Sequence, residues 1–344
     1  MKKILLFIAV VGIINSSCDL QDGGELYNYI DTFSICCINN DGSGYRKIID
    51  KEYASPPKAI YFIDNNNKII IVEYDRIREL DLVNLENNYY NFGVIKLSAL
   101  SKDRSQLALI KEGNGDQDIY IFNTNSKLFT KVTSSPTIIK RGVSFSNDGL
   151  SVVYSTFFTS YSTIETVNLS SGTVTELART NENNIAGWPF VLPIFSYNDT
   201  EVFYFSFENR ANYVNHICKL RSSHNYVIDD TTNANGGLTL SGSNGFIIYD
   251  EMESYPWRLI SHNLTLNIKN ILGDINYVGV TVSVSNDGLK VLYGFTGSYS
   301  NEDIILVNID GSNKKYLSKG QMPSLSSDGL KATFVLLEKI RNTY

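Results

Sequence analysis

Residues 144–155 read "SFSNDGLSVVYS" and residues 283–294 read "SVSNDGLKVLYG", so the chain carries nearly the same phrase twice. Each copy contains an apolar run, an Asn-Asp-Gly turn and a second run of alternating polarity, which is the pattern of a β-hairpin. Variants of the phrase start at 64, 101, 146, 196, 241, 285 and 326. Their spacing of 37 to 50 residues is the period of a four-stranded propeller blade.

A second hairpin follows each copy, as in "DIYIFNTNSKLFTKVT" from 118 and "DIILVNIDGSNKKYLS" from 303. Two hairpins per period supply the four strands of a blade, counted A to D from the axis outward. Residues 35–49 form a second hairpin without a first, and residues 323–336 form a first hairpin without a second. The sequence therefore predicts an all-β, seven-bladed β-propeller whose last blade is closed by N- and C-terminal strands. Six blades is the alternative, if the degenerate copy at 64 is not a true blade.

The repeats resemble those of the TolB-type β-propeller family, whose pattern is S-x-D-G-x-x-[IL]-x-[YF] followed by a hairpin of the form IY-x-x-N-x-D-G. "SNDGLKVLY" at 285–293 and "ICCINNDGSGYRKI" at 35–48 match this pattern closely. The resemblance covers residues 27–337 and implies a propeller fold. Some propellers of this wider group are lyases that hold a metal through several histidines near the axis, but the predicted A strands here carry no histidine.

The composition excludes one class of partner. The 344 residues are 43% hydrophobic and 19% charged, with a net charge of −6 and a pI near 5.2. Nucleic acid is not an expected partner, because its binding requires a basic surface. Short β-branched and aromatic runs broken by Asn, Asp, Gly and Ser recur along the chain, as expected of an all-β protein.

The N-terminus reads "MKKILLFIAVVGIINSSCDL". Two lysines, a short apolar run and small residues before Cys18 resemble a bacterial lipoprotein signal, with Asn15 as a departure from its usual aliphatic residue. This resemblance implies a signal peptide at 1–17, lipidation of Cys18, an acidic tether at 18–26 and a single propeller domain at 27–344. It also implies a membrane partner through the lipid anchor, in the bacterial cell envelope and at its outer membrane, facing the periplasm or the cell surface. An ordinary signal peptide is the alternative.

The serine that opens each repeat invites comparison with a catalytic nucleophile, but a unique catalytic residue would not recur in every blade. We expect these serines to start the A–B turn by bonding its backbone. The two positions before each repeat serine carry no titratable residue, so no catalytic residue is assigned. The repeat serines are Ser101, Ser146, Ser196, Ser241, Ser285 and Ser326.

The sequence does not predict a metal site or a cofactor. His216 and Cys218 lie two apart on one predicted strand, but no further Cys or His stands at ligand spacing. Cys36 and Cys37 are adjacent, and buried free thiols are favoured over a disulfide of either one with Cys218.

The ligand-binding surface is predicted on the face formed by the B–C and D–A connections, which are long and aromatic. Loop side chains have no core to fill by default, so aromatic residues there indicate recognition. The alternative is that these rings cap the core between blades. The predicted ligand-binding residues are Phe157, Phe158, Tyr161, Trp188, Phe190, Arg210, Tyr213, Tyr255, Trp257 and Tyr299.

These features together favour a lipid-anchored, non-enzymatic binding module for a peptide, protein or glycan. The rival hypothesis is an envelope-associated polysaccharide lyase or glycoside hydrolase, with carboxylates such as Asp250 or Glu251 in the same loops. A purely structural scaffold is a third possibility.

Overall fold

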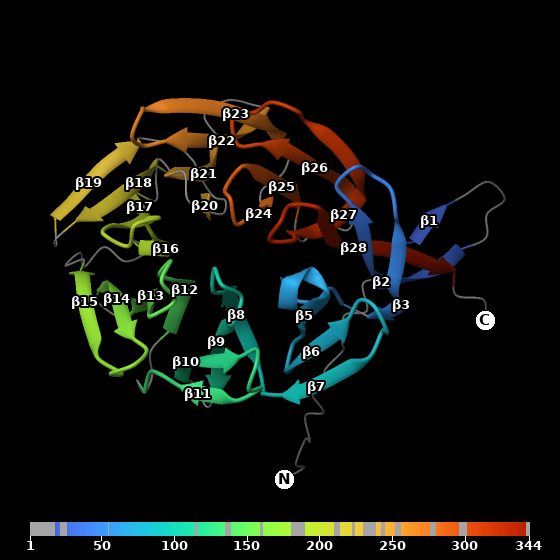
Figure 1. The fold of residues 1–344 in the computed structure, drawn as a ribbon, viewed down its shortest axis with the longest axis horizontal. Helices are drawn as coiled ribbons and strands as arrows, with labels where there is room; N and C mark the ends of the chain where they lie inside the picture. The colour runs from blue at the N-terminus through green and yellow to red at the C-terminus, as the bar shows by residue number, and fades with distance from the viewer. Residues whose placement is uncertain are drawn as a thin grey trace, which may run out of the picture.

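A computed structural model describes residues 18–20, 26–53, 55–113, 116–134, 139–158, 161–179, 190–209, 214–221, 224–229, 239–241, 245–251, 256–275, 280–295 and 301–341. Over these ranges the chain folds into antiparallel four-stranded sheets arranged in a ring, with the first strand of each sheet toward the centre and the last at the rim (Figure 1). No helix among them is long and apolar enough to cross a membrane.

Six blades follow one another along the chain. Blade 1 contains β4 (Ala59–Ile63), β5 (Lys68–Val72), β6 (Arg76–Asp81) and β7 (Asn87–Asn91). Blade 2 contains β8 (Ile95–Leu100), β9 (Gln106–Gly113), β10 (Asp116–Asn123) and β11 (Phe129–Lys131). Blade 3 contains β12 (Ile139–Phe145), β13 (Ser151–Phe157), β14 (Ser162–Asn168) and β15 (Val174–Arg179).

The next three blades have the same order. Blade 4 contains β16 (Phe190–Phe195), β17 (Val202–Asn209), β18 (Val214–Arg221) and β19 (His224–Asp229). Blade 5 contains β20 (Thr239–Ser241), β21 (Phe246–Glu251), β22 (Trp257–Asn263) and β23 (Ile268–Ile275). Blade 6 contains β24 (Val280–Val284), β25 (Lys290–Phe295), β26 (Glu302–Asn308) and the first half of β27 (Lys315–Leu325).

The seventh blade is made from both ends of the chain. The first half of β27 pairs with β26, and after an irregularity between Gln321 and Ser324 its second half pairs with β28 (Lys331–Arg341). β28 then pairs with β2 (Leu26–Asn39) over eleven residue pairs, and β2 pairs with β3 (Arg46–Tyr53). Figure 1 shows the N-terminal strands lying beside the C-terminal ones. The predicted closure is therefore confirmed.

The degenerate repeat at 64 forms a complete blade, so the described chain contains seven blades and the six-bladed alternative is wrong. Its A–B turn is a short 3₁₀ segment, η1 (Asp64–Asn66), in place of the Asn-Asp-Gly turn. Asn65 and Asn66 have positive φ angles there, which asparagine tolerates better than most residues.

The core lies between neighbouring blades and is built largely by the B strands. Since each blade is covered on both faces, a B strand is buried on both sides and reads as a continuous apolar run. One repeat position carries a tyrosine in blades 3 to 6, and each of these rings is at most 1% exposed: Tyr154, Tyr204, Tyr249 and Tyr293. Phe334 occupies the same position in blade 7 and is also fully buried. The repeated phrase therefore specifies the packing between blades.

The two ends of the ring differ in their connections. We call the end with the A–B and C–D turns the turn face, and the end with the B–C and D–A connections the loop face. A further short strand, β1 (Cys18–Leu20), pairs with the first residues of β2. Because β2 runs from this point to the C–D turn at Asn39, β1 lies at the loop-face end of blade 7. Part of the predicted tether is thus a strand.

Candidate functional site: the axial cavity

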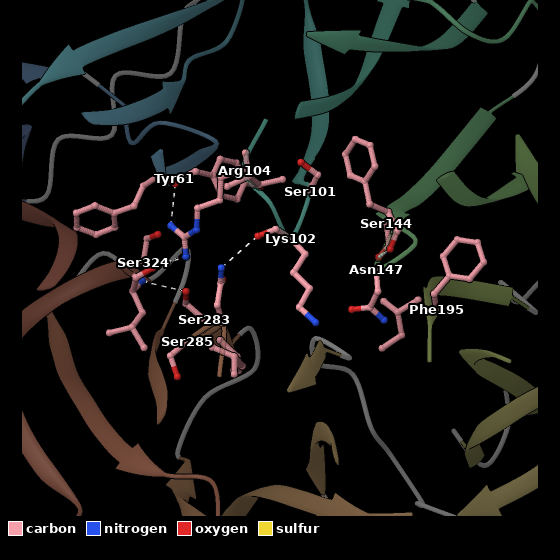
Figure 2. Close-up of a pocket in the computed structure, with 18 of the residues that line it drawn as sticks. Tyr61, Ser101, Lys102, Arg104, Ser144, Asn147, Phe195, Ser283, Ser285 and Ser324 are labelled. Carbon is pink, nitrogen blue, oxygen red and sulfur yellow. Dashed lines mark hydrogen bonds between the residues drawn. The ribbon is translucent and has the colours of Figure 1, made fainter. Parts of the chain in front are cut away.

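A cavity of about 280 Å³ lies where the inner strands converge at the turn face. Blades 1, 2, 3, 4, 6 and 7 each contribute the last residues of an A strand or the turn that follows it (Figure 2). The lining contains serine hydroxyls, two asparagine amides, apolar side chains and two cationic residues, Lys102 and Arg104. Its volume is at the lower end of the range for small-ligand pockets.

The repeat serines around this cavity stabilise their own turns, as the sequence predicts. In blade 3 the Ser146 hydroxyl donates to Asp148 Oδ1 at 2.6 Å and accepts from the Ser151 N–H at 2.9 Å. The same two bonds form at Ser101, Ser196, Ser285 and Ser326, with an asparagine replacing the aspartate in blade 4. Their hydroxyl protons are occupied, so these described serines are turn-forming residues rather than nucleophiles.

Three residues after the repeat serine, or after Ile63 in blade 1, which lacks that serine, the backbone adopts a positive φ angle. Glycine occupies this position in blades 3, 6 and 7, with φ between 66° and 72° at Gly149, Gly288 and Gly329. Three other blades carry a side chain at the same position: Asn66, Arg104 and Asp199, with φ between 59° and 65°. This conformation costs most side chains roughly 1–2 kcal/mol, but asparagine and aspartate tolerate it, so the arginine of blade 2 is the unusual residue at this position.

Each of these three side chains reaches a neighbouring blade. Asn66 Oδ1 accepts from the Ser327 N–H at 2.9 Å, which joins blade 1 to blade 7. Asp199 accepts from the Asn147 N–H at 2.7 Å, which joins blade 4 to blade 3. These bonds tie the turns into a ring around the cavity mouth.

Arg104 makes the corresponding contacts for blade 2. Its Nη1 donates to the Phe62 carbonyl of blade 1 at 2.8 Å, and its Nη2 approaches the Leu325 carbonyl of blade 7 at 3.4 Å. Its Nε is buried and has no hydrogen-bond partner. Burial lowers the pKa of Arg104 to about 10, against a smaller opposite effect of Asp328. The guanidinium therefore remains protonated at neutral pH.

Lys102 is the second cation of the cavity. Its backbone carbonyl accepts a bond from the Asn286 side chain of blade 6 at 3.3 Å, across the ring. Figure 2 shows its side chain extending toward the middle of the lining residues. No described residue forms an ion pair with it. The backbone of Lys102 is thus tied to blade 6, and its ammonium has no counter-charge among the described residues.

Four of the predicted ligand-binding residues have described side chains, and these four lie at the opposite end of the propeller. Phe158 and Tyr161 stack with ring centroids 4.2 Å apart at 19° in the B–C connection of blade 3. The Arg179 guanidinium lies 4.3 Å from the Tyr161 ring centroid and forms an ion pair with Glu176. Phe157 is the last residue of β13, with the Arg141 guanidinium 5.5 Å from its ring. These aromatic residues of blade 3 therefore contact one another and nearby arginines.

Trp257 has a different environment. It is the first residue of the C strand β22, is half-buried, and packs against the core cluster that contains Leu259 and Ile275. Phe190 begins the A strand β16, and only its backbone is described. The remaining predicted residues lie outside the described ranges: Trp188, Arg210, Tyr213, Tyr255 and Tyr299. The structure does not test whether this set binds a ligand.

The cysteines and carboxylates that the sequence analysis considered do not come together at one site. Cys36 and Cys37 are buried free thiols on β2, while Cys218 is on β18 in a non-adjacent blade. The preference for free thiols over a disulfide at Cys36 and Cys37 is therefore confirmed. Asp250 is buried on the B strand β21, and Glu251 lies 3.7 Å from Lys269. No group of three or more His, Cys, Asp or Glu residues suited to a metal ion occurs in the described part of the chain.

No family model and no curated protein matches the sequence. Solved structures do match the fold. An oligogalacturonate lyase in complex with manganese is 12% identical and has a TM-score of 0.63, over 94% of this chain and 96% of that chain. The oligogalacturonate lyase of Vibrio parahaemolyticus is 10% identical with a TM-score of 0.61, over 88% and 97% of the two chains.

TolB of Acinetobacter baumannii is 13% identical and has a TM-score of 0.56 over 88% of this chain. This chain spans 63% of the length of that TolB chain. Identities this low establish a propeller fold of the TolB and lyase type and nothing finer. The fold implied by the repeat pattern is confirmed.

Sequence reasoning missed the two cations of the axial cavity, although their signal was present. The turn that reads S-N-D-G in blades 3 and 6 reads S-K-D-R at residues 101–104. Two departures from the repeat within three residues, both to a positive residue and one at a glycine position, mark blade 2 as different. Such departures are more informative than the repeated residues, which serve the fold.

Proposed function

We propose that this protein is a binding module of the cell envelope that holds its ligand in the axial cavity of the turn face. The observation that carries the proposal is the convergence of six blades on one open cavity lined by hydroxyls, amides and two cations. Recognition sites usually combine an apolar lining with a few placed polar groups, and this cavity carries both kinds of residue. The ligand class stays that of the sequence prediction, a peptide, protein or glycan.

The lining favours binding over glycoside hydrolysis. A glycosidase requires two carboxyl groups at a set separation. The charged residues that line the described cavity are Lys102 and Arg104, and neither is a carboxylate. Asp250, a carboxylate of the rival hypothesis, is buried within a B strand of blade 5 and does not line this cavity. The binding module is therefore the function that the described residues support best.

The anchor belongs to the same proposal. Residues 18–20 form β1 beside the first residues of β2, at the loop-face end of blade 7. A lipid attached at Cys18 would hold this end of the propeller near the membrane and leave the turn face toward solvent. The cavity mouth would then be accessible to a ligand from outside the bilayer. Changing Cys18 to Ala should release the protein from membrane fractions, and retention of the variant would reject the anchor.

The test of the binding function is a screen of the protein against glycans and short peptides, with turnover measured beside binding. A Ser144→Phe variant fills the cavity from blade 3, where Ser144 makes only a 3.4 Å contact to the next carbonyl. Thr175→Phe adds the same ring to the exposed outer strand of that blade and is the matched control. Binding should be lost with Ser144→Phe alone. Equal binding by both variants would reject the cavity as the site.

A further inference from the structure

The charge of the axial cavity is unbalanced. Lys102 and Arg104 are its charged lining residues, and both are cationic. The aspartates two residues after the repeat serines accept bonds from their own A–B turns. Asp103, for example, accepts the hydroxyls of Ser101 and Ser105, each at 2.6 Å. None of these turn carboxylates lines the cavity, so the interior presents positive charge although the protein is acidic.

Neither cation has a counter-charge in direct contact. No ion pair joins Lys102 or Arg104 to any described residue, and the hydrogen bonds of Arg104 go to neutral backbone carbonyls. A half-buried cation without a partner is costly, because it loses hydration without a compensating charge. The unpartnered Nε of Arg104 adds an unsatisfied donor at the same place.

A structural role explains only part of this arrangement. Arg104 joins blade 2 to blades 1 and 7, just as Asp199 joins blade 4 to blade 3. That role accounts for its two Nη contacts. It does not account for the buried Nε or for a lysine at residue 102, where blades 3 and 6 carry asparagine. A single role shared by Lys102 and Arg104 explains both residues better than two separate roles do.

We propose that the axial cavity binds an oxyanion, the carboxylate, sulfate or phosphate group of a small ligand, between Lys102 and Arg104. The inference rests on the proposed binding function and specifies its ligand chemistry. Lys102 supplies a mobile point charge, and Arg104 supplies a fixed guanidinium with donors still unused. Ser283 accepts the Leu325 N–H at 2.9 Å, which leaves its own hydroxyl proton for the anion.

The repeat itself supplies the test variant. Lys102→Asn combined with Arg104→Gly converts the turn of blade 2 to the S-N-D-G sequence that folds in blades 3 and 6. The backbone conformation at residue 104 suits glycine. Asp199→Gly is the matched control, since it removes an inter-blade side chain from the same repeat position but does not line the cavity. Lys102→Asn alone is a second variant that keeps the blade contacts of Arg104.

Binding of sulfate, inorganic phosphate and succinate to the full-length protein is measured by calorimetry at low ionic strength. The single Lys102→Asn variant should bind about tenfold more weakly, and the double variant about a hundredfold more weakly. Asp199→Gly should bind like the unmodified protein. The preferred probe identifies the source: succinate indicates a carboxylate ligand, and phosphate indicates a phosphorylated one.

The inference is overturned if the unmodified protein binds none of the three anions, or if all variants bind them equally. Its failure can be distinguished from failure of the proposed function. A neutral ligand whose binding is lost with Ser144→Phe but kept in the Lys102→Asn, Arg104→Gly variant would uphold the cavity and reject the anion. Ligand binding that survives both changes would reject both.

Discussion

The turn face and the loop face of this propeller are built by different chemistry. On the turn face, short connections are held by side-chain oxygens that bond backbone N–H groups, as Ser146 and Asp148 do in blade 3. On the loop face, rings and a guanidinium group pack together in blade 3, in the stack of Phe158, Tyr161 and Arg179. The cavity described above lies at the turn face.

The difference shows how a repeat protein separates folding from recognition. Residues that recur in several blades, such as the turn serines and the B-strand tyrosines, hold the ring together. Residues that depart from the repeat, such as Lys102 and Arg104, are available for recognition. Aromatic content alone does not distinguish recognition residues from core residues, because a ring such as Trp257 also packs against the core between blades.

The largest expected effect tests whether the two faces are ends of one cooperative ring. Deleting residues 26–53 removes β2 and β3, which strips two strands from blade 7 and exposes the edge of β28. The cooperative thermal transition should be lost, as followed by circular dichroism. Deletion of residues 18–20 removes only β1 and should leave the transition unchanged. A normal transition after the larger deletion would mean that the blades fold independently.

A second test asks whether a loop-face aromatic residue stabilises the core. Replacing Trp257 by Ala should lower the free energy of unfolding by about 2 kcal/mol, less than for a fully buried tryptophan because this ring is half-exposed. Phe158→Ala removes a ring that stacks on Tyr161 and should cost about 1 kcal/mol or less. Urea denaturation measures both. If Trp257→Ala leaves stability unchanged but weakens ligand binding, the loop-face prediction gains support.

The corresponding test on the turn face concerns one hydroxyl. Ser146→Ala removes the bonds to Asp148 and to the Ser151 N–H and leaves these groups without that partner. The expected loss in free energy of unfolding is about 1–2 kcal/mol. Ser170→Ala, in the exposed C–D turn of the same blade, should cost only a few tenths of a kcal/mol. Equal losses at the two sites would contradict the special role of the repeat serine.

The fold could be predicted from the sequence because the same signals recur. The hairpin phrase, its spacing and the unpaired hairpins at 35–49 and 323–336 specify seven blades and their closure. The site could not be predicted in the same way. Whether Lys102 lies at the axis depends on how six turns converge in space, and that convergence has no local signal. The sequence predicts a loop at Trp257, because nothing in it marks this residue as the start of β22.

The smallest expected effect concerns the A–B turns of blades 3 and 4, which carry aspartate and asparagine at the same position. Hydrogen bonds from the Ser146 hydroxyl and the Leu150 N–H lower the pKa of Asp148. A lowered pKa in the folded state stabilises the protein at pH values above the unfolded pKa of about 4, and this contribution is lost as the pH falls through the folded value. Blade 4 carries Asn198 at this position, which accepts the Ser196 hydroxyl at 2.7 Å without a charge.

Asp148→Asn reproduces the turn of blade 4 in blade 3 and removes the titration while keeping the acceptor. The melting temperature of the variant should lie slightly below that of the unmodified protein at pH 7, and the difference should shrink toward zero as the pH falls to about 2. Asn198→Asp in blade 4 is the reciprocal change and should introduce the same pH dependence there. A difference that stays constant with pH would mean that the hydroxyl bond stabilises the turn independently of charge, and that the aspartate of the repeat serves only as an acceptor.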